Sequence, residues 1–155
     1  MTFLEYLAAL EATPHRVQAL VDGLDDDALS RRPADGRFTL RENVAHLRDI
    51  DAEGYERRVA LMIEEEHPIL PDVDGRRLAE ERAYHLQEVE PALEAFETSR
   101  ARAVARLRAA GEKVLDRTGH LNGVGDVTLA QLLERWLQHD AEHLADMVAL
   151  LKSEG

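Results

Sequence analysis

The chain has no cysteine, and its basic residues are far fewer than its acidic ones. Without cysteine there is no disulfide, no thiolate nucleophile and no sulfur-ligated zinc or iron–sulfur site, so any bound metal needs nitrogen and oxygen ligands. The 19 Lys and Arg residues stand against 31 Asp and Glu residues, which gives a formal net charge of −12. Because contact with a phosphate backbone requires basic surface, we expect no nucleic-acid partner.

Long apolar runs are missing as well. No stretch approaches the ~20 residues that cross a bilayer, and the first residues lack the basic and then apolar pattern of a signal peptide. We therefore expect no membrane partner and a cytoplasmic protein. The length of 155 residues and the hydrophobic content of 45% predict one domain over 1–155, with a core that needs no structural metal.

Three helix starts carry the same local signal. Residues 2–5, 39–42 and 128–131 each place a threonine three residues before Glu or Gln, as a capping box requires. In this motif the hydroxyl accepts a hydrogen bond from the third amide, and the longer side chain accepts one from the threonine amide. Apolar residues at helical spacing follow each segment, so helices are predicted to begin near residues 2, 39 and 128.

The helical pattern extends over most of the chain. Pro14 should kink or briefly break the first helix, because Thr13 can cap a fresh turn that starts at the proline. No alternating strand pattern is visible. We therefore expect main helices over 3–22, 40–66, 91–110 and 129–152, with short helices over 25–29 and 76–87.

These elements predict an all-α fold, a four-helix bundle. The connection from 67 to 90 is long enough to travel the length of the bundle, whereas the other connections are shorter. A crossover between the second and third main helices gives up-down-down-up order. In that order the last helix lies antiparallel to the second.

Two histidines, His139 and His143, stand four residues apart in the last main helix. This spacing places two imidazoles one turn apart, about 6 Å along the axis, where they can share one metal ion. An imidazole on a core-facing stripe needs a polar partner or a metal. The other residues of that stripe are Leu132, Trp136, Met147 and Leu150.

A third ligand is expected from the second main helix, where His46 lies about 10 Å from the helix start. His143 lies about 14 Å before the end of the last helix, so antiparallel packing brings the two histidines to within about a turn of the same level. Three imidazoles leave open coordination positions, which is typical of a reactive metal site. Imidazole suits zinc, which we expect first, and also nickel, iron and copper.

Two other interpretations remain open. The histidines can be structural, with hydrogen bonds to Asp49, Asp140 or Glu142, and the same carboxylates are candidates to orient imidazoles that bind a metal. Residues 139–143 also match the inverted zinc-peptidase pattern H-x-x-E-H. Those peptidases need a further glutamate well downstream, and only 12 residues follow His143, so a peptidase is not expected.

The histidines and their neighbours resemble a known family. Residues 38–47, Phe-Thr-Leu-Arg-Glu-Asn-Val-Ala-His-Leu, and His-Asp-Ala-Glu-His at 139–143 are similar to motifs of the DinB/YfiT-like superfamily of metal-binding bundles. The resemblance covers nearly the whole chain. Phe38 stands where the family commonly has tryptophan, a packing change that affects no ligand.

This resemblance implies a divalent metal held by His46, His139 and His143, and frequently a homodimer. Some relatives are S-transferases that use bacillithiol, mycothiol or a similar small thiol, and others are described as metal-dependent hydrolases. We therefore expect a metal-dependent thiol S-transferase or hydrolase that acts on a small electrophilic molecule, with the thiol as a cosubstrate in the first case. The alternative is a noncatalytic dimeric bundle with structural histidines, because the sequence offers no evident nucleophile or pair of catalytic acids.

The remaining histidines are expected at the surface: His15, His67, His85 and His120. Among them His120 is the second choice as a ligand, if the glycine-rich loop that contains it folds over the site. A basic patch on the third main helix is expected to pair with the acidic excess, and it consists of Arg100, Arg102, Arg106 and Arg108.

Overall fold

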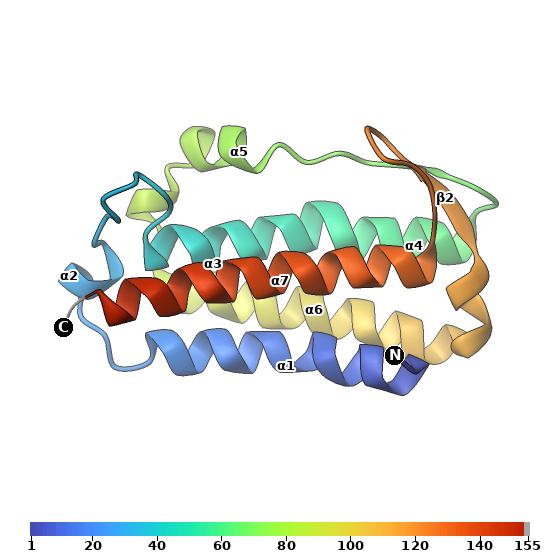
Figure 1. Cartoon of the computed structure of the whole chain (residues 1–155), viewed down its shortest axis with the longest axis horizontal. Helices are drawn as coiled ribbons and strands as arrows, with labels where there is room; N and C mark the ends of the chain where they lie inside the picture. Colours follow the sequence, from blue (N-terminus) through green and yellow to red (C-terminus); the bar gives the residue numbers. More distant parts are fainter. Residues whose placement is uncertain (154–155) are drawn as a thin grey trace.

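The computed structural model describes residues 1–153 and is built mostly from helices (Figure 1). Residues 154–155 of the expected domain lie outside the described part. The elements in chain order are α1 (Phe3–Val21), α2 (Asp26–Leu29), α3 (Leu40–Asp49), the π-helix η1 (Ile50–Tyr55), α4 (Glu56–Glu64), β1 (Ile69–Leu70), α5 (Gly75–Glu81), the 3₁₀ helix η2 (Tyr84–Leu86), α6 (Val89–Ala110), the 3₁₀ helix η3 (Glu112–Asp116), β2 (Thr118–Leu121), β3 (Gly125–Thr128) and α7 (Leu129–Lys152).

Capping boxes begin α1, α3 and α7, as predicted. In each one the threonine hydroxyl accepts from the amide of the third helical residue, and the side chain of that residue accepts from the threonine amide. α7 covers the range predicted for the last main helix, and Asp25 caps the short helix α2. Local capping chemistry therefore fixes where three of the long helices start.

Four rods form the bundle (Figure 1). The first rod is α1, the third is α6 and the fourth is α7. The second rod consists of α3, η1 and α4, which follow one another without a break. Cross-helix bonds join α1 to α7 through Tyr6–Glu134 and Thr13–Asp140, α4 to α6 through Glu56–Arg102 and Glu64–Arg106, and α3 to α7 through Asn43–His143 and His46–His139. Residue numbers rise together along the first two pairs of helices and oppositely along the third. The four rods therefore run up, down, down and up.

A small sheet lies at the end of the bundle where the chain begins (Figure 1), so the prediction of no strands was wrong. β1 pairs in parallel with β2, and β2 pairs antiparallel with β3. The strands have only two to four residues, too few to show an alternating pattern. The turn between β2 and β3 contains Asn122-Gly123, which is a hairpin signal in its own right.

The second rod is not the continuous α-helix predicted over 40–66. The π-helix η1 occupies six residues in its middle, and α4 ends at Glu64. An inserted π-helical turn shifts the faces of a helix relative to each other and is frequent at functional sites. It buries both Asp51 and Tyr55.

Two other boundaries differ from the predictions. The helix predicted over 76–87 is divided into α5 and η2, because Ala83 between them has a left-handed backbone with φ of 48°. The third main helix begins at Val89, two residues earlier than predicted. The long connection between the second and third rods therefore contains β1, α5 and η2, and Figure 1 shows α5 on the outer side of α3.

α1 continues through Pro14, so the predicted break is corrected. Thr13 caps no new turn, because its hydroxyl donates to Asp140 Oδ2 at 2.7 Å. Proline lacks an N–H, so the carbonyl of Leu10, four residues earlier, has no helical partner at that position. Arg100 Nη1 donates to this carbonyl at 2.8 Å, which satisfies it from another helix.

Arg100 is a buried charge that joins all four rods. Its side chain is 1% exposed, and its guanidinium donates to both oxygens of Asp51 in η1 and both oxygens of Asp140 in α7, over 2.8–3.1 Å. It also lies 4.5 Å from the ring centre of Trp136. The other arginines of the expected patch pair at the surface, as Arg102–Glu56, Arg106–Glu64 and Arg108–Glu11.

Apolar side chains fill the space between the rods in two clusters, one that includes Trp136 and one that includes Phe96. The predicted inward stripe of α7 is buried, with Leu132, Met147 and Leu150 beside the tryptophan. Within residues 1–153 no helix is long and apolar enough to cross a membrane.

We predict that Arg100→Ala destabilises the fold by about 3–5 kcal/mol, because it leaves two buried carboxylates without their partner. Arg102→Ala is the matched control. It breaks a pair at the surface and should cost no more than about 1 kcal/mol. Urea unfolding followed by circular dichroism measures both values. Equal effects of the two substitutions would contradict the role given to Arg100.

Candidate metal centre

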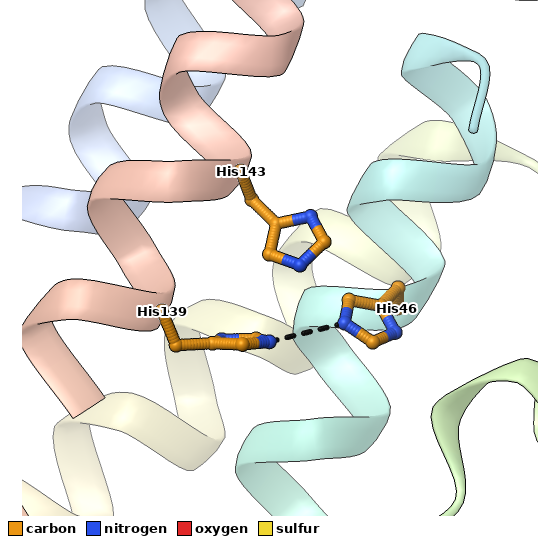
Figure 2. A group of neighbouring side chains, drawn as sticks. All are labelled: His46, His139 and His143. Atoms are coloured by element: carbon orange, nitrogen blue, oxygen red, sulfur yellow. Dashed lines mark hydrogen bonds between the residues drawn. The ribbon is translucent and has the colours of Figure 1, made fainter. Parts of the chain in front are cut away.

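Three imidazoles converge between α3 and α7. His46 lies in the second turn of α3, and His139 and His143 lie one turn apart on α7. Figure 2 shows their rings directed toward one another. When one nitrogen is taken from each ring, the three nitrogens all lie within 4.8 Å of one another. His46 Nε2 is 3.1 Å from His139 Nε2.

This donor set fits a divalent metal ion. Two imidazole nitrogens bound tetrahedrally to zinc, each at about 2.0–2.1 Å, lie roughly 3.3 Å apart, close to the separation of the His46 and His139 nitrogens. His46 Nδ1 is buried and has no hydrogen-bond partner among the described residues. His46 Nε2, which faces His139 Nε2, is therefore the nitrogen that a shared ion would use.

Asn43 orients His143. Its side-chain oxygen lies 2.8 Å from His143 Nδ1, while its amide nitrogen donates to the carbonyl of Thr39 at 3.0 Å. Because the amide group is fixed from both ends, the histidine nitrogen must be the donor, and His143 Nε2 keeps its lone pair for a metal. Asn43 was not among the predicted site residues, although it stands one turn before His46 in the same motif.

All three rings are held in the neutral form that binds metals. Burial lowers the pKa of His46 to about 3 and that of His139 to about 4, and it lowers the pKa of His143 as well. Repulsion between neighbouring imidazolium charges lowers the pKa of His46 and His139 further. At neutral pH the site therefore presents lone pairs rather than positive charge.

The three carboxylates predicted beside the ligands have other partners. Asp49 accepts from Arg48 and Tyr84 and pairs with Arg82. Asp140 accepts from Arg100 and Thr13, and Glu142 accepts from Gln138. Among the described hydrogen bonds, none joins these carboxylates to an imidazole of the site. Asp140 instead anchors α7 one residue after His139.

A close backbone approach covers His46. The first residue of α5, Gly75, lies so near that a Cβ built there would be 2.6 Å from His46 Cε1 and 2.9 Å from His46 Nδ1. Phe38 contacts the same imidazole, with ring centres 5.3 Å apart. The long connection between the second and third rods therefore shields one side of the site.

A cavity adjoins the site at His139. Its volume is about 650 Å³, and it is also lined by Tyr55 from η1, by the polar face of α7 and by the β2–β3 hairpin. The ring centres of Tyr55 and His139 are 6.2 Å apart. Sequence reasoning missed Tyr55, because its position depends on the π-helical turn. Such a volume is typical of pockets that bind small molecules.

The remaining histidines lie elsewhere. His15, His67 and His85 are exposed, as predicted. His120, the second choice as a ligand, lies in β2 and has its Nδ1 3.1 Å from Asp126, whose same oxygen is 3.2 Å from His67 Nε2. The hairpin therefore folds toward the cavity, but the structure groups His120 with these two residues and not with the three imidazoles.

Comparison with known proteins gives one family. A family model described as the DinB superfamily matches residues 9–147. Two proteins of Oceanobacillus iheyensis, both named as candidate metal-dependent hydrolases, are 26% identical over 148 and 152 residues, which is 96% and 97% of this chain and 85% and 87% of theirs. A protein of Geobacillus kaustophilus with the same description is 26% identical over 97% of this chain and 85% of its own.

A solved structure has the same fold. YfiT from Bacillus subtilis, described as a candidate metal-dependent hydrolase with an unusual four-helix bundle topology, superposes with a TM-score of 0.90. The match covers 99% of this chain and 87% of that one at 23% sequence identity. The predicted four-helix bundle is confirmed by this likeness.

We predict that Asn43→Ala weakens zinc affinity about tenfold or more, because His143 loses the acceptor that fixes its tautomer. Asn122→Ala in the hairpin is the matched control, since Asn122 bonds Asp72 and no histidine. Competition with a chromogenic chelator measures both affinities. Unchanged zinc binding in Asn43→Ala would contradict the orienting role.

Proposed function

This chain belongs to the DinB superfamily, and from its three-histidine site we propose that it is a metal-dependent enzyme acting on a small molecule. The observation that carries the proposal is the approach of three imidazole nitrogens to within 4.8 Å of one another. Three neutral ligands beside an open cavity are typical of catalytic sites, since structural zinc sites are closed by four protein ligands.

His46, His139 and His143 would hold the ion. A divalent ion held in this way lowers the pKa of a water or thiol in its open coordination position. Zinc is the first candidate for an imidazole-only donor set, with nickel and iron as alternatives. Asn43 keeps His143 in the correct tautomer, and the Arg100–Asp140 pair fixes the helical turn that carries His139.

Hydrolysis of a small electrophilic molecule is the reaction that the relatives' names favour. The cavity wall supplies carboxylates that could take up a proton, of which Glu142 directly precedes the ligand His143. This carboxylate accepts a hydrogen bond from Gln138 at 3.1 Å and is exposed at the cavity wall.

Transfer of a small thiol to an electrophile is the second candidate. It is supported by the size of the cavity beside His139, which is far larger than one water requires. Because the chain has no cysteine, the sulfur would arrive with a low-molecular-weight cosubstrate such as a bacillithiol-type thiol. Assays of purified protein with thiols and a chromogenic electrophile, run beside ester and amide substrates, distinguish transfer from hydrolysis.

The noncatalytic alternative is a dimeric bundle whose histidines are structural. A tightly bound metal with a position open to water or thiols counts against it. The expected homodimer and cytoplasmic location stay predictions, which sedimentation and fractionation of the source cells would measure.

We predict that the purified chain holds about one divalent ion, and that His139→Ala abolishes binding while leaving the helical circular dichroism unchanged. His120→Ala is the matched control and should keep the ion, because His120 pairs with Asp126. Metal analysis after gentle purification, followed by zinc and nickel titrations, gives the result. If neither reveals bound metal, the proposed function fails.

A further inference from the structure

Two arginines flank Tyr55 at the wall of the cavity that reaches His139. Arg58, one turn into α4, lies 4.9 Å from the centre of the tyrosine ring, and its Nε donates to the carbonyl of Pro71 at 2.9 Å. Arg135 lies on α7, one turn before His139, and lines the cavity together with Tyr55. The tyrosine hydroxyl therefore stands near two positive charges.

Among the described residues, no carboxylate pairs with both Arg58 and Arg135. Arg135 lowers the pKa of Arg58 by repulsion, in addition to the larger effect of burial. Asp72 attracts Arg58 but accepts a hydrogen bond from Asn122. In the part of the chain that the structure describes, Arg135 has no hydrogen bond or ion pair. Two repelling guanidinium groups without a shared carboxylate are stabilised when an anion binds between or beside them.

The other charges of the cavity wall are already engaged. Glu134 accepts from the Tyr6 hydroxyl at 2.6 Å, and Glu142 accepts from Gln138. Asp126 is held by two histidines, His67 and His120. Among the residues described, Arg135 is the charged group of the wall that has no hydrogen bond or ion pair.

We propose that Arg135 and the Tyr55 hydroxyl bind a carboxylate group of the substrate, with Arg58 behind the tyrosine adding to the positive potential. This inference rests on the proposed function, because it names the substrate class of the same site. A guanidinium fork matches the planar geometry of a carboxylate. A doubly charged phosphate would suffer more repulsion from the three carboxylates of the wall, so the singly charged group is favoured.

Arg135 and His139 both line the cavity. They are one turn apart on α7, about 5–6 Å between Cβ atoms, so a carboxylate bound by Arg135 lies on the same wall as a candidate metal ligand. The phenol of Tyr55 has an O–H group that can donate to the carboxylate. The proposed substrate is therefore a carboxylic acid oriented by two donors at its carboxylate end.

The test uses two thiols that differ in one group. Zinc-loaded protein is titrated calorimetrically with 3-mercaptopropionate and with its neutral counterpart 3-mercaptopropanol. We expect the acid to bind at least about tenfold more tightly, as a charge-assisted hydrogen bond provides. Arg135→Gln should remove this preference and Tyr55→Phe should reduce it, while zinc content and the affinity for the neutral thiol stay unchanged.

Arg57→Gln is the matched control, since it removes one positive charge from α4, the helix of Arg58, at an exposed position outside the cavity. If Arg57→Gln lost the preference for the acid to the same extent, net charge alone would explain the effect and the proposal would be overturned. A preference for the acid that survives Arg135→Gln would also overturn it. If 2-mercaptoethylphosphonate bound more tightly than 3-mercaptopropionate and this binding depended on Arg135, the site would bind a phosphate-type group and the carboxylate proposal would be overturned.

A second measurement separates this inference from the metal site. In metal-free protein, propionate should shift the NMR signal of the Arg135 Nε–H group, and propionamide should not. If the chain binds no metal but this shift occurs, the proposed function fails and the anion site stands. If metal binds but no shift or thiol preference is seen, the anion site alone is overturned.

Discussion

The bundle depends on one buried guanidinium. Arg100 in α6 bonds Asp51 in η1, Asp140 in α7 and the Leu10 carbonyl in α1, so a single side chain fixes the levels of all four rods. Apolar packing alone tolerates sliding of one helix along another, whereas paired charges in a dry interior have one low-energy arrangement. Since Asp140 directly follows His139, the same bonds set the height at which the two histidines of α7 face His46 of α3.

Much of the fold could be predicted from local chemistry, and the exceptions share a physical cause. The starts of α1, α3 and α7 depend on a threonine and the residue three positions later, which are visible in the sequence. The strands and the π-helical turn depend on contacts made by other parts of the chain. Gly119 illustrates this, because a Cβ there would lie 2.5 Å from Met62 Sδ of α4, a closeness that no local pattern reveals.

The same division applies to the site. The spacing of His139 and His143, with the antiparallel level of His46, could be predicted because helix geometry converts residue numbers into distances. The positions of the groups around these three histidines could not be predicted from the sequence. Asn43 takes the orienting place that was predicted for a carboxylate, since its amide can accept from an imidazole while donating to its own helix. Tyr55 reaches the cavity only because η1 contains an extra residue per turn.

Pro14 is ordinarily a weak point of a helix, yet in α1 it creates an attachment point. Had residue 14 carried an N–H, the Leu10 carbonyl would also accept from its own helix, and Arg100 would share this acceptor. The chain thus lacks one hydrogen bond within α1 and has one between α1 and α6 at the same carbonyl. The missing N–H of Pro14 weakens α1 as an isolated helix, but it leaves the Leu10 carbonyl to Arg100, which also bonds Asp140 beside His139.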